Sequence, residues 1–344
     1  MIRIGVIGYG YWGPNIVRNL CGLDGCQIGG VCDQSPAALD RVTKTYPSMP
    51  VTTQPSELLT SAQIDAIAIV TPVWTHFELA EAALENGKHV FVEKPFTATS
   101  HQAEELIELA ERKNLKIMVD HTFLFTGAVR KIRELLDDGV LGDLYYYDST
   151  RVNLGLFQHD VSVIWDLAPH DLAIMDFLIQ KTPEAVSATG GAHLNGLADV
   201  AFITTYFPGN TIAHVNVNWL SPVKVRTTLI GGEKKMLVWN DLEADEKIKV
   251  YDKGVQMNHG HRRADDPLRE GVGLHELLVS YRSGDMWAPR VEQTEALKVE
   301  LDYFMDCVRK DRTPFNDGVA GSRVVKLLEA ADKSLKERGK AIQL

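Results

Sequence analysis

A glycine-rich turn near the start of the chain has the spacing that binding of a dinucleotide requires. The apolar run 2–7 is followed by Gly8, Gly10 and Gly13, and Asp33 closes a second apolar run twenty residues later. Such glycines permit a tight turn, close approach of the backbone to a pyrophosphate, and packing of the next helix. The N-terminus of that helix favours the negative charge of the phosphates. The cofactor residues predicted from this segment are Gly8, Tyr9, Gly10, Tyr11, Trp12, Gly13 and Asp33.

The acidic residue indicates which dinucleotide is bound. Asp33 would accept hydrogen bonds from the adenosine ribose, and its carboxylate would repel the 2′-phosphate of NADP. The next two residues, Gln34 and Ser35, carry no positive charge, whereas Arg41 follows further on. The sequence therefore favours NAD and leaves NADP open through Arg41.

A lysine follows another short apolar strand, in the triplet Glu93-Lys94-Pro95. Ligands of an open parallel sheet bind beyond the carboxyl ends of its strands, so Lys94 would lie near the nicotinamide and could exchange a proton with a substrate hydroxyl. A surface lysine before a loop is the other interpretation. Thr71-Pro72 occupies the same place after the preceding strand, and His76 would contact the cofactor or cap the next helix. The cofactor residues predicted here are Thr71, Pro72, His76, Glu93 and Lys94.

A second group of chemical side chains lies in the segment 165–171. Pro169 is tolerated in the first turn of a helix, so we expect that helix to begin near Asp166. Asp166 and His170 would share one helix face, and the carboxylate would balance the helix dipole to give a histidine that acts as a base near neutrality. A capping aspartate beside a structural histidine is the alternative. Neither this pair nor His259-Gly260-His261 has a third ligand, so we predict no metal site.

The elements that position these residues change character along the chain. The first 120 residues alternate between short apolar strands and helices, which predicts a doubly wound parallel sheet. Helices 166–179, 292–309 and 318–338 accompany a later, largely antiparallel sheet, and the segment 253–290 is left as a long loop. The strands expected in the first unit are 2–7, 27–32, 65–70, 89–92 and 116–119, and the helices are 13–22, 35–45, 55–60, 75–86 and 100–114. The strands expected in the second are 143–152, 184–193, 199–206, 211–219, 223–231, 234–239 and 247–251.

Composition excludes several classes of partner. The net charge of −10 argues against nucleic acid and anionic membranes as partners. No apolar stretch reaches the roughly 20 residues that span a bilayer. The four cysteines form no Cys-x-x-Cys pair, which is typical of reduced thiols in a cytoplasmic protein.

Taken together, the glycine turn, Thr71-Pro72 with His76, Glu93-Lys94-Pro95, and Asp166 with His170 resemble the glucose–fructose oxidoreductase, inositol dehydrogenase and rhizopine-catabolism (Gfo/Idh/MocA) family. The resemblance covers essentially the whole chain. It implies a Rossmann domain at 1–122 and a C-terminal α+β domain with an open-faced sheet at 123–344. It also implies NAD(P)-dependent oxidation or reduction of a sugar or cyclitol hydroxyl. Lys94 and His170 would be the acid–base residues, assisted by Asp166, and the open face would form a homodimer or homotetramer.

A narrower resemblance concerns the substrate. The stretches 120–125, 151–155 and 160–161 resemble family members encoded among nucleotide-sugar genes, which implies oxidation of a ring carbon, often C3. Arg262, Arg263 and Arg282 would meet a diphosphate or form a solvated loop face. A dehydrogenase of free cyclitols or monosaccharides and a non-catalytic NAD-binding sensor are the alternative functions. The predicted substrate residues are Lys94, His121, Arg151, Asn153, Trp165, Asp166 and His170.

Overall fold

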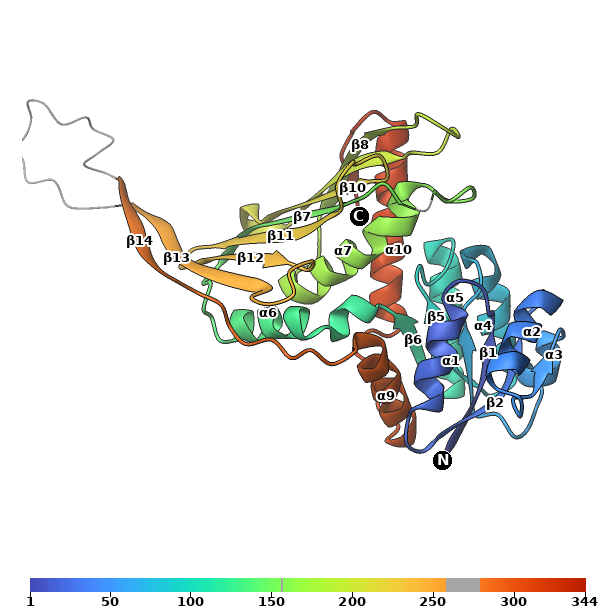
Figure 1. The fold of residues 1–344 in the computed structure, drawn as a ribbon. Helices are drawn as coiled ribbons and strands as arrows, with labels where there is room; N and C mark the ends of the chain where they lie inside the picture. The colour runs from blue at the N-terminus through green and yellow to red at the C-terminus, as the bar shows by residue number, and fades with distance from the viewer. Residues whose placement is uncertain (156, 258–278) are drawn as a thin grey trace, which may run out of the picture.

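Six parallel strands form the first sheet of the computed structural model, which describes residues 1–155, 157–257 and 279–344 (Figure 1). The strands lie in the order β3-β2-β1-β4-β5-β6, so the chain builds the sheet outward in opposite directions from β1 and from β4. This switch point places a crevice at the carboxyl ends of these two strands. The strands are β1 (Ile2–Ile7), β2 (Cys26–Cys32), β3 (Val51–Thr52), β4 (Ala66–Ile69), β5 (His89–Glu93) and β6 (Ile117–Asp120).

Helices cover both faces of this sheet. Val6 and Phe91 belong to one apolar core, whereas their neighbours Ile7 and Val92 belong to the other. Because successive strand residues point to opposite faces, both faces must be buried, as the predicted doubly wound fold requires. The helices are α1 (Gly13–Cys21), α2 (Pro36–Thr45), α3 (Pro55–Leu59), α4 (His76–Glu85) and α5 (Ser100–Lys113), with a short 3-10 turn η1 (Val73–Thr75) before α4.

Nine strands form the second sheet, in the order β14-β13-β12-β11-β7-β10-β9-β8-β15. All its pairs are antiparallel except β7 with β10, so the prediction of a largely antiparallel sheet is confirmed. Its strands are β7 (Leu144–Val152), β8 (Ala185–Gly191), β9 (Val200–Tyr206), β10 (Ile212–Asn218), β11 (Val225–Gly232), β12 (Met236–Asn240), β13 (Ile248–Met257), β14 (Val279–Trp287) and β15 (Ile342–Gln343).

One face of the second sheet is covered and the other is open. Helices α6 (Gly127–Asp137) and α7 (Val163–Ile179) lie beneath the sheet, and no helix of the described residues lies on its opposite face (Figure 1). Alternation along the strands agrees: Ile203 is fully buried, whereas Phe202 is 41% exposed. The 3-10 turns η2 (Thr122–Phe125) and η3 (Pro208–Asn210) join neighbouring elements, and none of the described helices could cross a membrane.

The last two long helices return to the first sheet. Helix α9 (Ala296–Arg309) contacts α1, and α10 (Gly318–Lys336) contacts α5. Between them, the side-chain amide of Asn316 donates to the carbonyl of Val119 at 2.8 Å, and the amide of Val119 donates to the carbonyl of Asn316 at 3.0 Å. The boundary at residue 122 stays a prediction, and these helices belong by contact to both sides of it.

Three expectations about the second unit were wrong or incomplete. Helix α6 was not predicted, although Thr126 caps it by accepting from the amide of Val129. Helix α7 begins at Val163 rather than near Asp166, so Pro169 lies inside the helix, which forgoes one backbone hydrogen bond there. The expected loop 253–290 is in part the β13–β14 ribbon, because residues of these two strands pair in antiparallel register.

The arginines expected in that loop have different outcomes. Arg282 lies on β14 and donates to the carboxylate of Asp252 at 2.7 Å, so its guanidinium is used between strands. Arg262 and Arg263, like His259 and His261, lie outside the described residues.

Candidate functional site

The glycine turn after β1 leaves room for phosphate groups in front of α1. Gly8 has φ +105°, and a Cβ there would lie 2.2 Å from the carbonyl oxygen of Val70. A Cβ on Gly13 would lie 2.4 Å from the carbonyl oxygen of Gly8, whereas one on Gly10 would meet nothing within 4 Å. Two glycines are therefore required by packing, and the third borders open space. That space, at the N-terminus of a helix, fits a pyrophosphate.

Asp33, the predicted ribose ligand, is fixed beside this turn. Its carboxylate accepts hydrogen bonds from the amides of Tyr9 at 2.6 Å and Ser35 at 2.8 Å. Each oxygen retains acceptor capacity for a ribose hydroxyl. Arg41 donates to the carbonyl of Tyr9 at 3.0 Å. The positive charge that could accept the 2′-phosphate of NADP therefore lies beside the same turn.

The aromatic side chains of the turn differ in their surroundings. Tyr9 is buried, so only its backbone borders the predicted phosphate site, while Tyr11 is exposed. The indole N–H of Trp12 approaches the carboxylate of Asp120 at 3.4 Å. Trp12 therefore points toward the ends of β5 and β6, where Lys94 also lies.

His76 ties together two of the loops that carry predicted cofactor residues. Its fully buried imidazole has Nε2 at 2.8 Å from the carbonyl oxygen of Thr71 and Nδ1 at 2.9 Å from that of Pro95. Burial lowers the pKa of His76 and the backbone carbonyls raise it, with burial the larger effect; a neutral ring donates to only one of the two carbonyls at a time. The loop containing Thr71-Pro72 and the loop that follows Lys94 are thereby held in one arrangement.

Lys94 joins the first unit to helix α7 of the second. Its ammonium donates to the backbone carbonyl of Asp166 at 2.9 Å and lies 3.7 Å from the carboxylate of the same residue. The Asp166 carboxylate also accepts from the indole N–H of Trp219 at 3.2 Å. Both members of the Lys94–Asp166 pair are 19% exposed, so the ammonium is held but reachable.

Two histidines stand near this lysine. Burial first, then the charges of Lys94, Arg151 and Arg226 and the neighbouring His121, lowers the pKa of His170 well below its ordinary value. Burial and then Lys94 lower the pKa of His121 to about 3. Both rings are therefore neutral at physiological pH. The expected balance between Asp166 and His170 is not found, because Asp166 binds Lys94 and Trp219.

A group of buried carboxyl groups adjoins Lys94. Glu93 and Asp120 are directly opposite on β5 and β6, and Glu300 of α9 reaches the same place. Burial and then the neighbouring Asp120 raise the pKa of Glu93 and of Glu300 well above the ordinary value. Protonated carboxyl groups can share hydrogen bonds with an ionised one. The sequence offered no sign of Glu300, because it lies on a helix far along the chain.

The other predicted substrate residues are only partly available to a ligand. Arg151 is buried and pairs with Asp171 at 2.5 Å. The indole N–H of Trp165 donates to Asp332 of α10 at 2.7 Å, and its partly buried ring packs against both apolar cores. Asn153 pairs its backbone amide with Asn218 at the end of β7. The described residues contain no group of three or more His, Cys, Asp or Glu side chains that could hold a metal ion.

Comparisons with known proteins agree with this geometry. Residues 2–121 match the oxidoreductase family model with an NAD-binding Rossmann fold, and residues 129–238 match the Gfo/Idh/MocA C-terminal domain. UDP-N-acetylglucosamine 3-dehydrogenase of Acidithiobacillus ferrooxidans is 27% identical over 94% of both chains. A solved structure of that enzyme superimposes with TM-score 0.78 at 25% identity over 98% of both chains. Inositol 2-dehydrogenase of Rhizobium meliloti is 24% identical over 98% of both.

The fold and the glycine turn define an NAD-binding oxidoreductase. The chain belongs to the Gfo/Idh/MocA family, as the matches to both family models show. These matches confirm three predictions: the fold class, the NAD-binding domain, and a place among sugar dehydrogenases and related oxidoreductases.

Proposed function

We propose that this protein is an NAD-dependent dehydrogenase that oxidises a ring hydroxyl of a nucleotide-linked sugar, with C3 as the first position to test. One observation carries the proposal: the ammonium of Lys94, at the carboxyl end of β5, meets Asp166 on the helix that also carries His170. The likeness to UDP-N-acetylglucosamine 3-dehydrogenase supports the substrate class.

Each residue of this group has a distinct role in the proposal. NAD, when bound, supplies an acceptor for the hydride of the ring C–H. The ammonium of Lys94 hydrogen-bonds the reacting oxygen and stabilises the negative charge that develops on it. The neutral imidazole of His170 accepts the hydroxyl proton. Asp166 holds the ammonium through its backbone carbonyl and its carboxylate.

The decisive experiment follows reduction of NAD by nicotinamide absorbance. UDP-, GDP- and dTDP-sugars are compared with free inositols and free sugars at equal concentration. We expect reduction with a nucleotide sugar only. Bound NAD that never changes redox state with any of these compounds would instead indicate a sensor without turnover.

A second candidate is a dehydrogenase of free cyclitols. The full-length likeness to inositol 2-dehydrogenase favours it. Reduction of NAD by free inositols alone, with no response to nucleotide sugars, would replace the first proposal by this one.

We also propose that two or four copies associate through the open face of the second sheet. Phe202, Tyr206 and Ile212 are each about two-fifths exposed there, and the ring of Phe202 stacks on His214. Exposed apolar side chains that gather on one face are typical of a protein interface. Sedimentation of the Phe202→Glu variant should show a smaller species than the original chain.

The four free thiols support a reducing, cytoplasmic location.

A further inference from the structure

Two arginines face each other on the covered side of the second sheet. Arg151 of β7 and Arg226 of β11 are directly opposite in the strand register. Both occupy the alternating positions that include Ser149 and Thr228, which are buried on the face of the sheet that α7 covers. Like charges placed directly opposite on neighbouring strands destabilise a sheet. Some compensating contact is therefore needed at this place.

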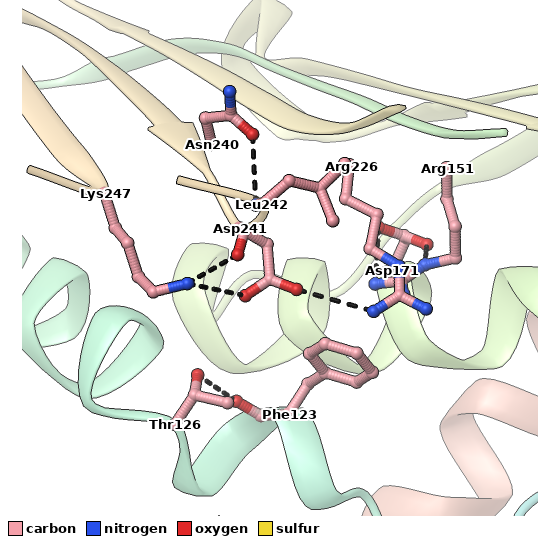
Figure 2. A network of polar contacts seen from close by, with 9 residues as sticks. All are labelled: Phe123, Thr126, Arg151, Asp171, Arg226, Asn240, Asp241, Leu242 and Lys247. Carbon is pink, nitrogen blue, oxygen red and sulfur yellow. Dashed lines mark hydrogen bonds and ion pairs between the residues drawn. The ribbon is translucent and has the colours of Figure 1, made fainter. Parts of the chain in front are cut away.

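The ring of Phe123 supplies part of that compensation. The guanidinium carbon of Arg151 lies 4.4 Å from the ring centroid, and that of Arg226 lies 5.6 Å from it. Figure 2 shows the ring beneath both side chains. A π-face attracts cations, which accounts for the approach of two guanidinium groups to one side chain.

One of the two carboxylates beside this arginine pair is shared with a third cation, Lys247. Asp171 binds Arg151 at 2.5 Å, whereas Asp241 lies 3.5 Å from Arg226 and 3.9 Å from Lys247 (Figure 2). Three cations thus share two carboxylates among the residues drawn. The longest of these pairings are those of Arg226 and Lys247, which share the single carboxylate of Asp241.

Arg226 is the member of the arginine pair that a ligand can reach. A third of its side chain is exposed, compared with 5% for Arg151. The imidazole of His170, the proposed base, packs against the same Phe123 ring, with the two ring centroids 5.0 Å apart. Arg226 and His170 are therefore neighbours of the same aromatic side chain.

We propose that Arg226 binds an anionic oxygen group of the substrate and so places the sugar ring beside His170. The group is either a carboxylate on the sugar or the diphosphate of its nucleotide, since both match the planar donor fork of a guanidinium. The buried guanidinium of Arg151 adds positive charge next to Arg226, and the Phe123 ring holds both guanidinium groups in position. This inference rests on the proposed function in that the anion belongs to a sugar substrate.

The same charge reaches the proposed base. Arg226 and Arg151 are among the cations that lower the pKa of His170, together with Lys94. An anion bound at Arg226 offsets that positive charge, so it raises the pKa of His170 toward its ordinary value. A substrate that carries the anion would therefore make its own base more effective.

The test measures binding without turnover. Protein saturated with NADH is titrated calorimetrically with UDP-glucuronate, UDP-glucose, D-glucuronate and D-glucose. In Arg226→Gln we expect affinity for anionic compounds to fall about ten- to hundred-fold, the size of a lost hydrogen bond to a charged group, with D-glucose unaffected. Arg226→Lys, which keeps the charge but loses the fork, should lie between.

Lys247→Gln is the matched control, because it removes the same charge from the same network without touching Phe123. It should change each affinity by less than about threefold. Loss confined to the two glucuronates identifies the carboxylate as the bound group, and loss confined to the two nucleotide sugars identifies the diphosphate. Equal affinities in Arg226→Gln and the original chain, or an equal loss in Lys247→Gln, would overturn the inference.

The two proposals can fail separately. If no sugar reduces NAD but anion binding still depends on Arg226, the proposed dehydrogenase function fails and the anion subsite stands. If nucleotide sugars reduce NAD equally well in Arg226→Gln, the function stands and the subsite is wrong.

Discussion

Helix α7 carries two aspartates, and each binds a cation from another element in a different way. Asp166 and Lys94 are 3.7 Å apart and both 19% exposed. Asp171 and Arg151 are 2.5 Å apart and are only 3% and 5% exposed. The first pair is loose and lies at the carboxyl end of β5, where we propose that the substrate binds. The second is short, has a further hydrogen bond from Ser149, and lies under the sheet.

The difference separates two uses of charge. A buried pair is costly to break, because the remaining ion has no water to replace its partner. A looser pair that keeps some contact with solvent contributes less to stability and leaves the ammonium able to bind another oxygen. We therefore expect Lys94–Asp166 to matter for turnover and Arg151–Asp171 to matter for folding.

The largest effect should come from Lys94→Ala. Loss of the ammonium should lower kcat about 10²–10⁴-fold, while the stability changes by less than about 1 kcal/mol. Steady-state kinetics and urea unfolding measure the two quantities, and NAD affinity should be nearly unchanged. Lys113→Ala, which breaks a surface pair with Glu85, is the control and should leave both unchanged. Unaltered turnover would remove Lys94 from the mechanism.

Asp171→Ala should reverse that pattern. It strands the buried Arg151 guanidinium, so we expect a loss of about 3–5 kcal/mol in the free energy of unfolding, measured with urea. Replacing both partners, as Arg151→Met with Asp171→Leu, should recover much of the loss because no buried charge then remains. A loss under about 1 kcal/mol in the single variant would contradict the contrast between the pairs.

Asp33→Ala extends the comparison to a carboxylate that we predict to bind the cofactor. Its hydrogen bond to the ribose should be worth about 1.5–3 kcal/mol, so NAD affinity should fall and discrimination against NADP should relax. Binding of both dinucleotides is measured by fluorescence titration. Asp33→Asn keeps the acceptor and loses the charge, which separates hydrogen bonding from repulsion. An unchanged preference would mean that the ribose lies elsewhere.

The smallest effect belongs to an exposed pair. Arg18 and Asn19 hydrogen-bond Glu295 and lower its pKa to about 2. Because the folded-state pKa is depressed, the stabilisation is present above the ordinary value of 4.5 and is lost as the pH falls toward 2. Glu295 is 45% exposed, so Glu295→Gln should cost only about 0.2–1 kcal/mol at pH 7. Urea unfolding at pH 7 and pH 2 should show the difference disappearing in acid.

Local patterns can indicate the proposed cofactor side of the site, but they cannot indicate the contacts on its proposed substrate side. Gly8, Gly13 and Asp33 lie within one strand–turn–helix–strand unit, where spacing along the chain fixes spacing in space. Arg226 meets Arg151 only through the register of two strands that are distant in sequence, and Glu300 meets Asp120 only through the return of α9. No periodicity or motif reports such contacts.

Pairings on helix α7 were predicted incompletely for the same reason. Spacing correctly placed Asp166 and His170 on one helix, but the partners of Asp166 come from β5 and from Trp219. The unpredicted helix α6 is different, since its cap at Thr126 and its buried Val129, Ile132 and Leu135 were visible in the sequence.

The contact between Asn316 and Val119 has a consequence for synthesis of the chain. The edge strand of the NAD-binding sheet is hydrogen-bonded by a residue made 197 positions later. A ribosome adding about 5–20 residues each second needs roughly 10–40 s to make that stretch. During this time the edge of β6 is open to pairing with other nascent chains. The NAD-binding unit is therefore made first but completed last. We expect the yield of folded protein in cells to depend on chaperones that shield the β6 edge.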